Sequence, residues 1–304
     1  MQVMINKISQ AVKHYCYDQD YSSSDERFLH RYNNFSDKET LRDSGYIVYG
    51  VLSGIPNSTH IKAKSLLFQG DNECWKYFER TAVFWTYGHL RDKWIDHLKG
   101  AYEYALYIER RDLVDRLIDI SLCYLTDDSN LSNNEFKRQR VYPSTQLVHF
   151  LIEKWLGYNP AKELILKYGD GYGIYQKIID NWEDFSKIEG EYWDELCEYH
   201  LNRIGLQQGE KWKNEEFLDS GLVPMELINL IKVRQKLGLD IPVINNPLFD
   251  TNMARMPIIP TGYNEKNDII FVLVDLTVKT QRKYTIQEVE EYIKLTTDEK
   301  NIIW

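Results

Sequence analysis

Four carboxylates stand at helical spacing in one short stretch of the 304-residue sequence: Glu191, Asp194, Glu195 and Glu198. Offsets of three, four and seven residues place them in one line on a helix surface, here called the acidic row. Such a row could bind a metal ion or perform acid–base chemistry, as paired carboxylates do in di-iron bundles. Those bundles also need Glu-x-x-His motifs on two helices, and the sequence contains no such pair.

Cys197 and His200 lie one turn apart on the same predicted helix and could supply two zinc ligands. No second pair stands at a spacing that would complete a tetrahedral site, so a buried thiol and a hydrogen-bonded histidine are the expected outcome. The motifs of serine hydrolases, zinc proteases and kinases are also missing from the sequence. The sequence therefore predicts no catalytic residue, no metal site and no cofactor.

The acidic row belongs to residues 178–200, a stretch with an unusual mixture of side chains. Between Asp180 and Glu198 the chain carries eight acidic residues and one lysine, interleaved with large aromatic residues. Solvated tails lack such aromatics, so the stretch should be folded and could present an acidic recognition surface. A merely solvated acidic face is the alternative. The candidate contact residues are Asp180, Glu183, Asp184, Glu191, Asp194, Glu195 and Glu198, with Trp182 and Trp193 as anchors if they are exposed.

A second periodic set on the same helix should hold it to the rest of the protein. Ile188, Tyr192, Leu196 and Tyr199 recur with helical period and are expected to face the core. The acidic row then lies on another face, where each like-charged pair four residues apart costs ~0.2–0.5 kcal/mol. Either basic residues of a neighbouring helix or a binding partner could compensate this repulsion.

Amphipathic patterns predict a mainly α fold, arranged as an antiparallel helical bundle or as an array of helical hairpins. The expected helices are residues 72–90, 92–106, 112–125, 143–155, 172–185, 187–204 and 224–238. Residues 45–52 are apolar and β-branched and fit either a strand or a buried helix. Gly54 and Pro56 should interrupt whatever element forms there.

Composition changes after residue 240, which predicts a boundary between an all-helical body (1–240, irregular over 1–60) and a small α/β appendage (241–304). Four of the eight prolines fall between Pro242 and Pro260. The run 268–278 (DIIFVLVDLTV) has the composition of a strand, and residues 256–261 could pair with it as a β-hairpin. A final helix begins at Thr285, which forms a predicted capping box with Glu288.

Overall charge and the amino terminus restrict the partners and the compartment. A net charge of −9 and an isoelectric point near 5.4 disfavour binding to nucleic acid. Residues 1–20 lack the apolar run of a signal peptide, and no stretch approaches the ~20 apolar residues of a membrane span. The four cysteines, without any Cys-x-x-Cys pair, indicate free thiols. We therefore expect a cytoplasmic protein with neither nucleic-acid nor membrane partners.

Two segments resemble helical immunity proteins of bacterial polymorphic toxin systems. Residues 94–122 (WIDHLKGAYEYALYIERRDLVDRLIDISL) combine a helix with a small-residue face, a charged turn and a second helix. Residues 224–248 (PMELINLIKVRQKLGLDIPVINNPL) join a long helix to Gly-Leu-x-Ile-Pro and an Asn-Pro-Leu end, and are similar to the carboxy-terminal part of the Immunity protein 49 family. The resemblance covers the central and later helical region and has no counterpart after residue 256.

This resemblance implies a cytoplasmic antitoxin that binds a cognate protein toxin and blocks it, without a cofactor and without catalysis. Many toxin domains that act on nucleic acid have basic clefts, which an acidic helix could occupy after electrostatically steered association. Two other classes stay open. One is a helical scaffold of another complex, and the other is an enzyme whose site is assembled from residues distant in the sequence.

Overall fold

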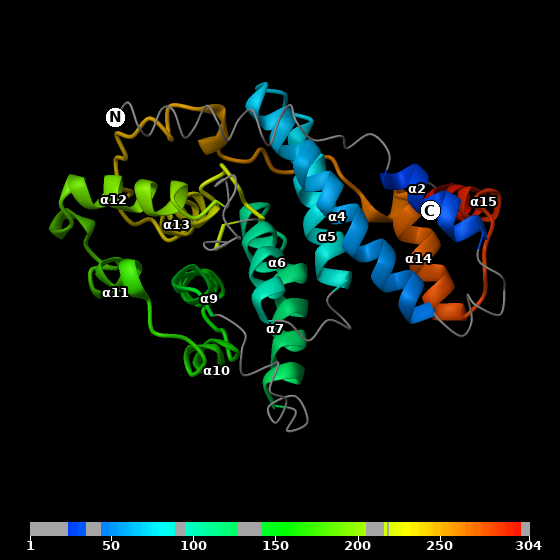
Figure 1. Ribbon diagram of the computed structural model, residues 1–304, viewed down its shortest axis with the longest axis horizontal. Helices are drawn as coiled ribbons and strands as arrows, with labels where there is room; N and C mark the ends of the chain where they lie inside the picture. Colours follow the sequence, from blue (N-terminus) through cyan, green and yellow to red (C-terminus); the bar gives the residue numbers. More distant parts are fainter. Residues whose placement is uncertain are drawn as a thin grey trace, which may run out of the picture.

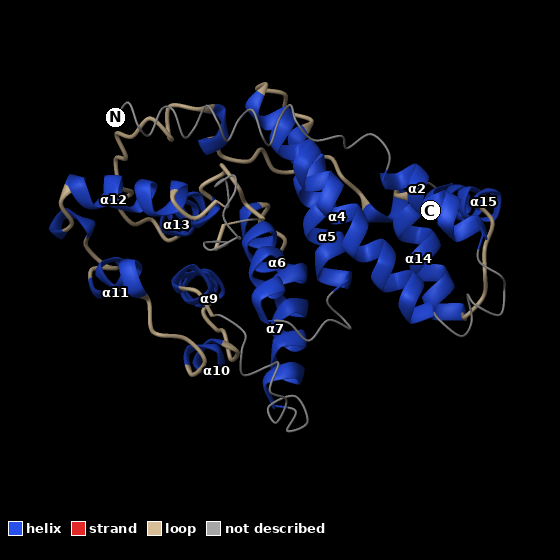
Figure 2. Ribbon diagram, in the orientation of Figure 1, coloured by secondary structure: helices blue, strands red, loops and turns tan. Residues whose placement is uncertain are grey.

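A computed structural model describes residues 24–34, 44–88, 95–126, 141–204, 216–217 and 219–298. Within these ranges the regular elements are all helices, and Figure 2 shows no strand; one isolated bridge joins Val141 and Gly169. The longer helices are α2 (Ser24–Asn34), α4 (Ser44–Phe68), α5 (Cys74–Gly88), α6 (Ile95–Tyr107), α7 (Arg111–Thr126), α9 (Pro143–Leu156), α12 (Gly190–Leu201), α13 (Met225–Lys236), α14 (Ile269–Thr280) and α15 (Ile286–Asp298). The predicted mainly α class is confirmed.

Short elements connect the longer helices. Two single-turn α-helices, α10 (Lys162–Leu166) and α11 (Gln176–Asp180), precede α12. Four 3-10 turns complete the described set: η2 (Gly173–Tyr175), η3 (Phe185–Lys187), η4 (Asn252–Ala254) and η5 (Glu265–Asn267). The helix expected over 172–185 is therefore a broken series of turns, and α12 is shorter at both ends than the helix expected over 187–204.

Helix α6 lies at the centre of the molecule and contacts α5, α7, α9 and α13 (Figure 1). Its tyrosines Tyr102, Tyr104 and Tyr107 are completely buried. Phe78 of α5 meets Tyr107 edge-on, with the ring centroids 5.3 Å apart. Because edge-to-face pairs add to the free energy of apolar burial, the many aromatic residues of this chain serve largely to join helices.

The carboxy-terminal β-hairpin predicted from the sequence is wrong. Its main strand, over residues 268–278, is the helix α14, and residues 256–261 form no strand. Asp268 explains the difference, because its side chain accepts hydrogen bonds from the backbone N–H groups of Ile270 and Phe271 and so caps the helix. A continuous apolar run fits a buried strand and a buried helix equally well, and here the cap favours the helix.

The break expected at Gly54 and Pro56 is also absent, since α4 runs through both residues. Proline removes one helical N–H donor and normally kinks or ends a helix. In this case α4 packs along α5, and the tertiary contact outweighs the local cost. Residues 45–52, for which strand and helix were both open, are part of this helix.

The two ends of the described chain pack together (Figure 1). Helix α4 contacts α2 and α14, and α14 contacts α15. The Tyr32 hydroxyl lies 3.0 Å from Thr277 Oγ1 and accepts a hydrogen bond from the N–H of Tyr284. The predicted capping box at Thr285 is confirmed, with the carboxylate of Glu288 accepting from the Thr285 N–H at 2.7 Å. One hydrophobic core extends from α2 to α15.

None of the helices in the described ranges has the length and apolar character needed to cross a bilayer.

Candidate functional site

The acidic row lies on the outer surface of α12, and all four of its carboxylates are exposed. Asp194 accepts a hydrogen bond of 2.7 Å from the Asn246 side chain. The side chains of Glu191, Glu195 and Glu198 form neither a hydrogen bond nor an ion pair with any residue in the described ranges. The described helices therefore supply no cation that pairs with these three carboxylates.

The opposite side of α12 faces the core as the periodicity predicts. Tyr192 and Leu196 are buried, as is Ile188 just before the helix. Tyr199 is half-buried and donates a hydrogen bond of 2.6 Å to the carboxylate of Glu216. The inner face of α12 is thus packed on the core, while the acidic row on its other face is exposed to solvent.

The other candidate carboxylates lie before α12 and have local roles. Asp180 is exposed and accepts a hydrogen bond from Gln176. Asp184 caps η3, because its carboxylate accepts hydrogen bonds from the N–H and hydroxyl of Ser186, and these bonds lower its pKa. The exposed side chain of Glu183 has only a loose ion pair, with 3.8 Å between Glu183 Oε1 and Lys154 Nζ. Of these three carboxylates, Glu183 has the weakest interaction with the rest of the protein.

Trp182 and Trp193 do not meet the condition for surface anchors, because each is only 4% exposed. Trp182 packs edge-on against Phe150 with the ring centroids 5.0 Å apart, and Trp193 packs against Phe185 at 5.4 Å. Their burial reflects the width of the apolar surface under this segment. Both tryptophans belong to the core, so we remove them from the set of candidate contact residues.

A buried arginine supports the same segment from inside. The guanidinium of Arg234, on α13, stacks 3.5 Å from the centroid of the Phe185 ring. It donates hydrogen bonds to the backbone oxygens of Trp182 and Asp240. Burial lowers the pKa of Arg234, while the charges of Asp240 and nearby carboxylates oppose that shift. This side chain joins the loop before α12 to the chain that leaves α13.

Cys197 and His200 form no metal site. The two ring nitrogens of His200 lie 2.9 Å from Glu226 Oε1 and 2.8 Å from the backbone oxygen of Gly221, so both already have partners in the protein. Burial raises the pKa of the Cys197 thiol. The described residues include no group of three or more His, Cys, Asp and Glu side chains that could hold a metal ion.

More charged residues are buried around Glu226. Lys99 Nζ lies 3.3 Å from Glu103 Oε1 and donates to the backbone oxygen of Glu216. Burial raises the pKa of Glu103 to about 8, although Lys99 opposes the shift. Burial also disfavours the charged form of Lys99, but the neighbouring carboxylates raise its pKa by more. These groups connect α6, α12 and α13, and both carboxylate oxygens of Glu103 are buried there without a hydrogen bond to a described residue.

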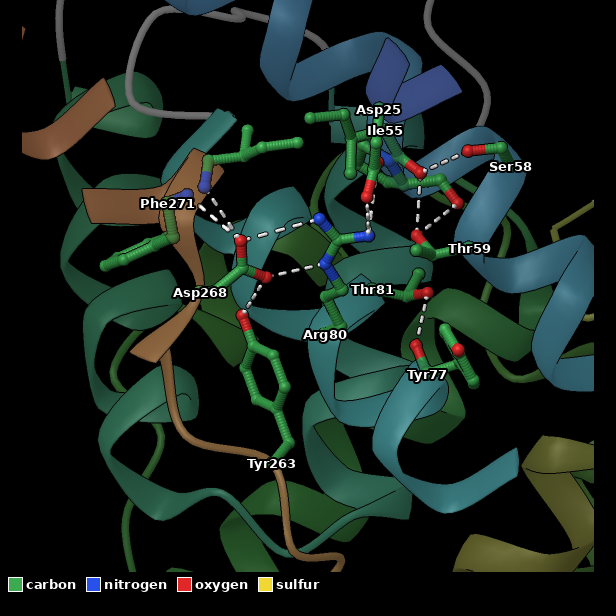
Figure 3. A network of polar contacts seen from close by, with 12 residues as sticks. Asp25, Ile55, Ser58, Thr59, Tyr77, Arg80, Thr81, Tyr263, Asp268 and Phe271 are labelled. Carbon is green, nitrogen blue, oxygen red and sulfur yellow. Dashed lines mark hydrogen bonds and ion pairs between the residues drawn. The ribbon is translucent and has the colours of Figure 1, made fainter. Parts of the chain in front are cut away.

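A cavity lined by described residues lies at the other end of the molecule, between α2, α4, α5 and α14, and has a volume of 710 Å³. Figure 3 shows its polar centre, where Arg80 Nε lies 2.6 Å from Asp268 Oδ2 and Arg80 Nη1 lies 3.0 Å from Asp25 Oδ2. Burial lowers the pKa of Arg80, but the two aspartates raise it by more. Tyr263 donates a further hydrogen bond of 3.0 Å to Asp268.

This cavity is large enough for a small molecule. Its lining carries two positive and two negative side chains: Lys62, Arg80, Asp25 and Asp268. Because Arg80 is already paired with both aspartates, the cavity offers little excess charge for recognising an ionic ligand. Sequence reasoning missed this cluster, since its members come from segments far apart in the chain. The one local signal was Asp268 immediately before an apolar run, which is typical of a helix N-cap.

No protein-family model matches the chain, and comparisons with curated proteins and with solved structures found no match either.

Proposed function

We propose that this chain is an immunity protein that neutralises a cognate toxin by binding it through the acidic row of α12. One observation carries the proposal: the two faces of α12 differ. Glu191, Glu195 and Glu198 are exposed on one face and pair with no cation among the described residues, while the opposite face of the helix is buried. Repulsion along the row is relieved when a basic surface approaches. The resemblance to immunity proteins supplies the class of partner.

Inhibition in this proposal is steric and electrostatic. A cleft that binds nucleic-acid phosphates carries clustered Lys and Arg, and an acidic helix competes for the same positive potential. Long-range attraction raises the association rate, and salt screens it. The chain needs neither a cofactor nor a catalytic residue for this action.

The decisive experiment looks for a toxin domain encoded beside the gene for this chain and uses the domain found there as the probe. We expect co-expression to protect cells and the two proteins to purify as a complex. The double variant Glu191→Lys, Glu195→Lys should lose about tenfold or more in affinity, because two attractive charges become repulsive. A chain that neither protects nor forms a complex would instead support the scaffold or enzyme alternatives.

A matched control lies at the opposite end of the molecule. Glu290→Lys combined with Glu291→Lys changes the net charge by the same amount on α15, far from α12 (Figure 1). Affinity close to that of the unmodified chain is expected for this control. Equal losses in both double variants would show that only overall charge matters, and would contradict the assignment of the acidic row.

A further inference from the structure

The buried tryptophans leave the acidic row without an apolar anchor, and the chain after α13 supplies one. Ile241 and Val243 are 44% and 78% exposed, which makes Val243 the most exposed large apolar residue in the described ranges. Exposed apolar side chains beside charged ones are typical of binding surfaces. Their position relative to the acidic row decides whether the two features can form one surface.

Two contacts place residues 240–246 alongside the acidic segment. At one end, Arg234 donates to the backbone oxygens of both Asp240 and Trp182. At the other end, the side chain of Asn246 donates to Asp194 at 2.7 Å. Figure 1 shows this gold-coloured stretch passing α12. Ile241 and Val243 therefore lie on a stretch that is tied near Trp182 at one end and to Asp194, a member of the acidic row, at the other.

The stretch has no regular secondary structure, but its pattern of exposure is that of an extended chain. Exposure alternates along it, with Ile241, Val243 and Asn245 outward and the intervening residues more buried, which is the period of an extended chain. No backbone group of residues 241–245 hydrogen-bonds to another described residue. An extended segment with free N–H and C=O groups can pair with a strand of another protein.

The sequence of this stretch also favours one kind of partner. Residues 237–252 contain Asp240 and Asp250 but no lysine or arginine. Asp194 lies at one end, and Glu183 follows Trp182 at the other. Pro242 lacks an N–H group, a feature that restrains edge strands from pairing indiscriminately. The partner that fits is an extended segment with apolar side chains flanked by basic ones.

We propose that residues 240–246 are a docking strand that pairs with an extended, basic-flanked segment of the toxin while the acidic row contacts the adjoining basic surface. This inference rests on the proposed function. The side chains of Val243 and Ile241 make the apolar contacts with the toxin segment, and the backbone hydrogen bonds align the two segments. The acidic row governs the rate of encounter, and the docking strand governs how long the complex lasts.

The test compares two valine-to-aspartate substitutions in the full chain, with the toxin domain of the preceding experiment as the probe. Val243→Asp should raise the dissociation constant about tenfold or more, because it places a charge in an apolar contact. Val278→Asp, at an exposed position on α14, should change it less than about twofold. Thermal melting of both free variants should match the unmodified chain, since neither valine is buried.

Hydrogen exchange gives the second readout. The amides of Val243, Ile244 and Asn245 should exchange quickly in the free chain and become protected in the complex. Unchanged affinity of Val243→Asp, or unprotected amides in the complex, would overturn the docking strand and leave the proposed function standing. Failure of the unmodified chain to bind the toxin domain would overturn both. A free chain that dimerises through these amides would assign the edge to a second copy instead, and would likewise overturn the proposal.

Discussion

Arg80 and Glu195 mark two regions that use charge in opposite ways. Arg80 lies mostly buried at the α14 end of the molecule and is paired with Asp25 and Asp268. Glu195 lies on α12 at the other end, exposed and without a hydrogen bond or ion pair to any described residue. A buried ion pair is costly to break from one side, because the remaining charge is left without a partner, whereas charges left unmatched at the surface are available to a binding partner. Four substitutions test this contrast, from the strongest expected effect to the weakest.

The largest effect is expected from Asp268→Ala. This change leaves the Arg80 guanidinium mostly buried without its nearest carboxylate and also removes the N-cap of α14. Breaking a buried ion pair from one side costs about 3–5 kcal/mol. Urea denaturation should show this loss in the free energy of unfolding. Asp25→Ala is the control and should cost clearly less, since Asp25 is 45% exposed; equal losses would contradict the ranking of the two partners.

The next largest loss of unfolding free energy is expected from a substitution on the buried face of α12. Leu196 is completely buried, so Leu196→Ala leaves a cavity and should cost about 2–4 kcal/mol of unfolding free energy. Guanidinium denaturation measures this loss. A cost below about 1 kcal/mol would mean that α12 is not held as firmly as its burial indicates.

Glu103 gives a smaller effect that depends on pH. Its folded-state pKa of about 8 lies above the ordinary value of 4.5, because burial disfavours the carboxylate. Between these values the folded chain keeps a proton that the unfolded chain releases, so its stabilising contribution is complete below pH 4.5 and declines as pH rises to 8. Lys99, Glu226 and Asp219 are the charged groups acting on it.

Replacing Glu103 by Gln removes the titrating group while keeping its size. The variant should be more stable than the unmodified chain by about 1–2 kcal/mol at pH 8 and should match it near pH 4.5. Thermal melting from pH 4.5 to 8 measures the difference. Parallel curves for the two proteins across this range would show that Glu103 is ionised throughout.

The smallest effect is expected on the outer face of α12. Glu195→Gln removes one exposed charge and relieves repulsion from Glu191 and Glu198, so stability should change by less than about 0.5 kcal/mol, with a slight gain at low salt. Urea denaturation at two ionic strengths measures it. A loss above 1 kcal/mol would reveal an internal partner for Glu195 and would remove the contrast with Arg80.

Local periodicity was sufficient to predict the two faces of α12. Tyr192 and Leu196 turn inward and the acidic row turns outward because helical spacing sorts them regardless of the rest of the fold. The burial of Trp193 could not be predicted from helical periodicity. It stands at the edge of the inward stripe, and only the packing of Phe185 against it determines that it is covered.

The cavity around Arg80 was beyond sequence reasoning for a different reason. Arg80 and Asp268 are 188 positions apart, and a single ion pair between distant segments has no local pattern. The contact between Arg80 and Asp268 also helps to decide the secondary structure of α14, because the apolar β-branched run of this helix fits a strand or a helix equally well. The Asp268 carboxylate caps the helix and binds Arg80 as well, so the secondary structure and the tertiary contact are decided together.

Arg234 has a consequence for how such a protein can diversify. Its buried guanidinium fastens the loop at Trp182 and the chain at Asp240 from the inside. The side chains of Ile241 and Val243 take no part in this fastening and are 44% and 78% exposed, so substitutions there should leave the fold unchanged. If these side chains contact a partner as proposed above, one or two replacements at this surface would change which partner is bound while the fold stays the same.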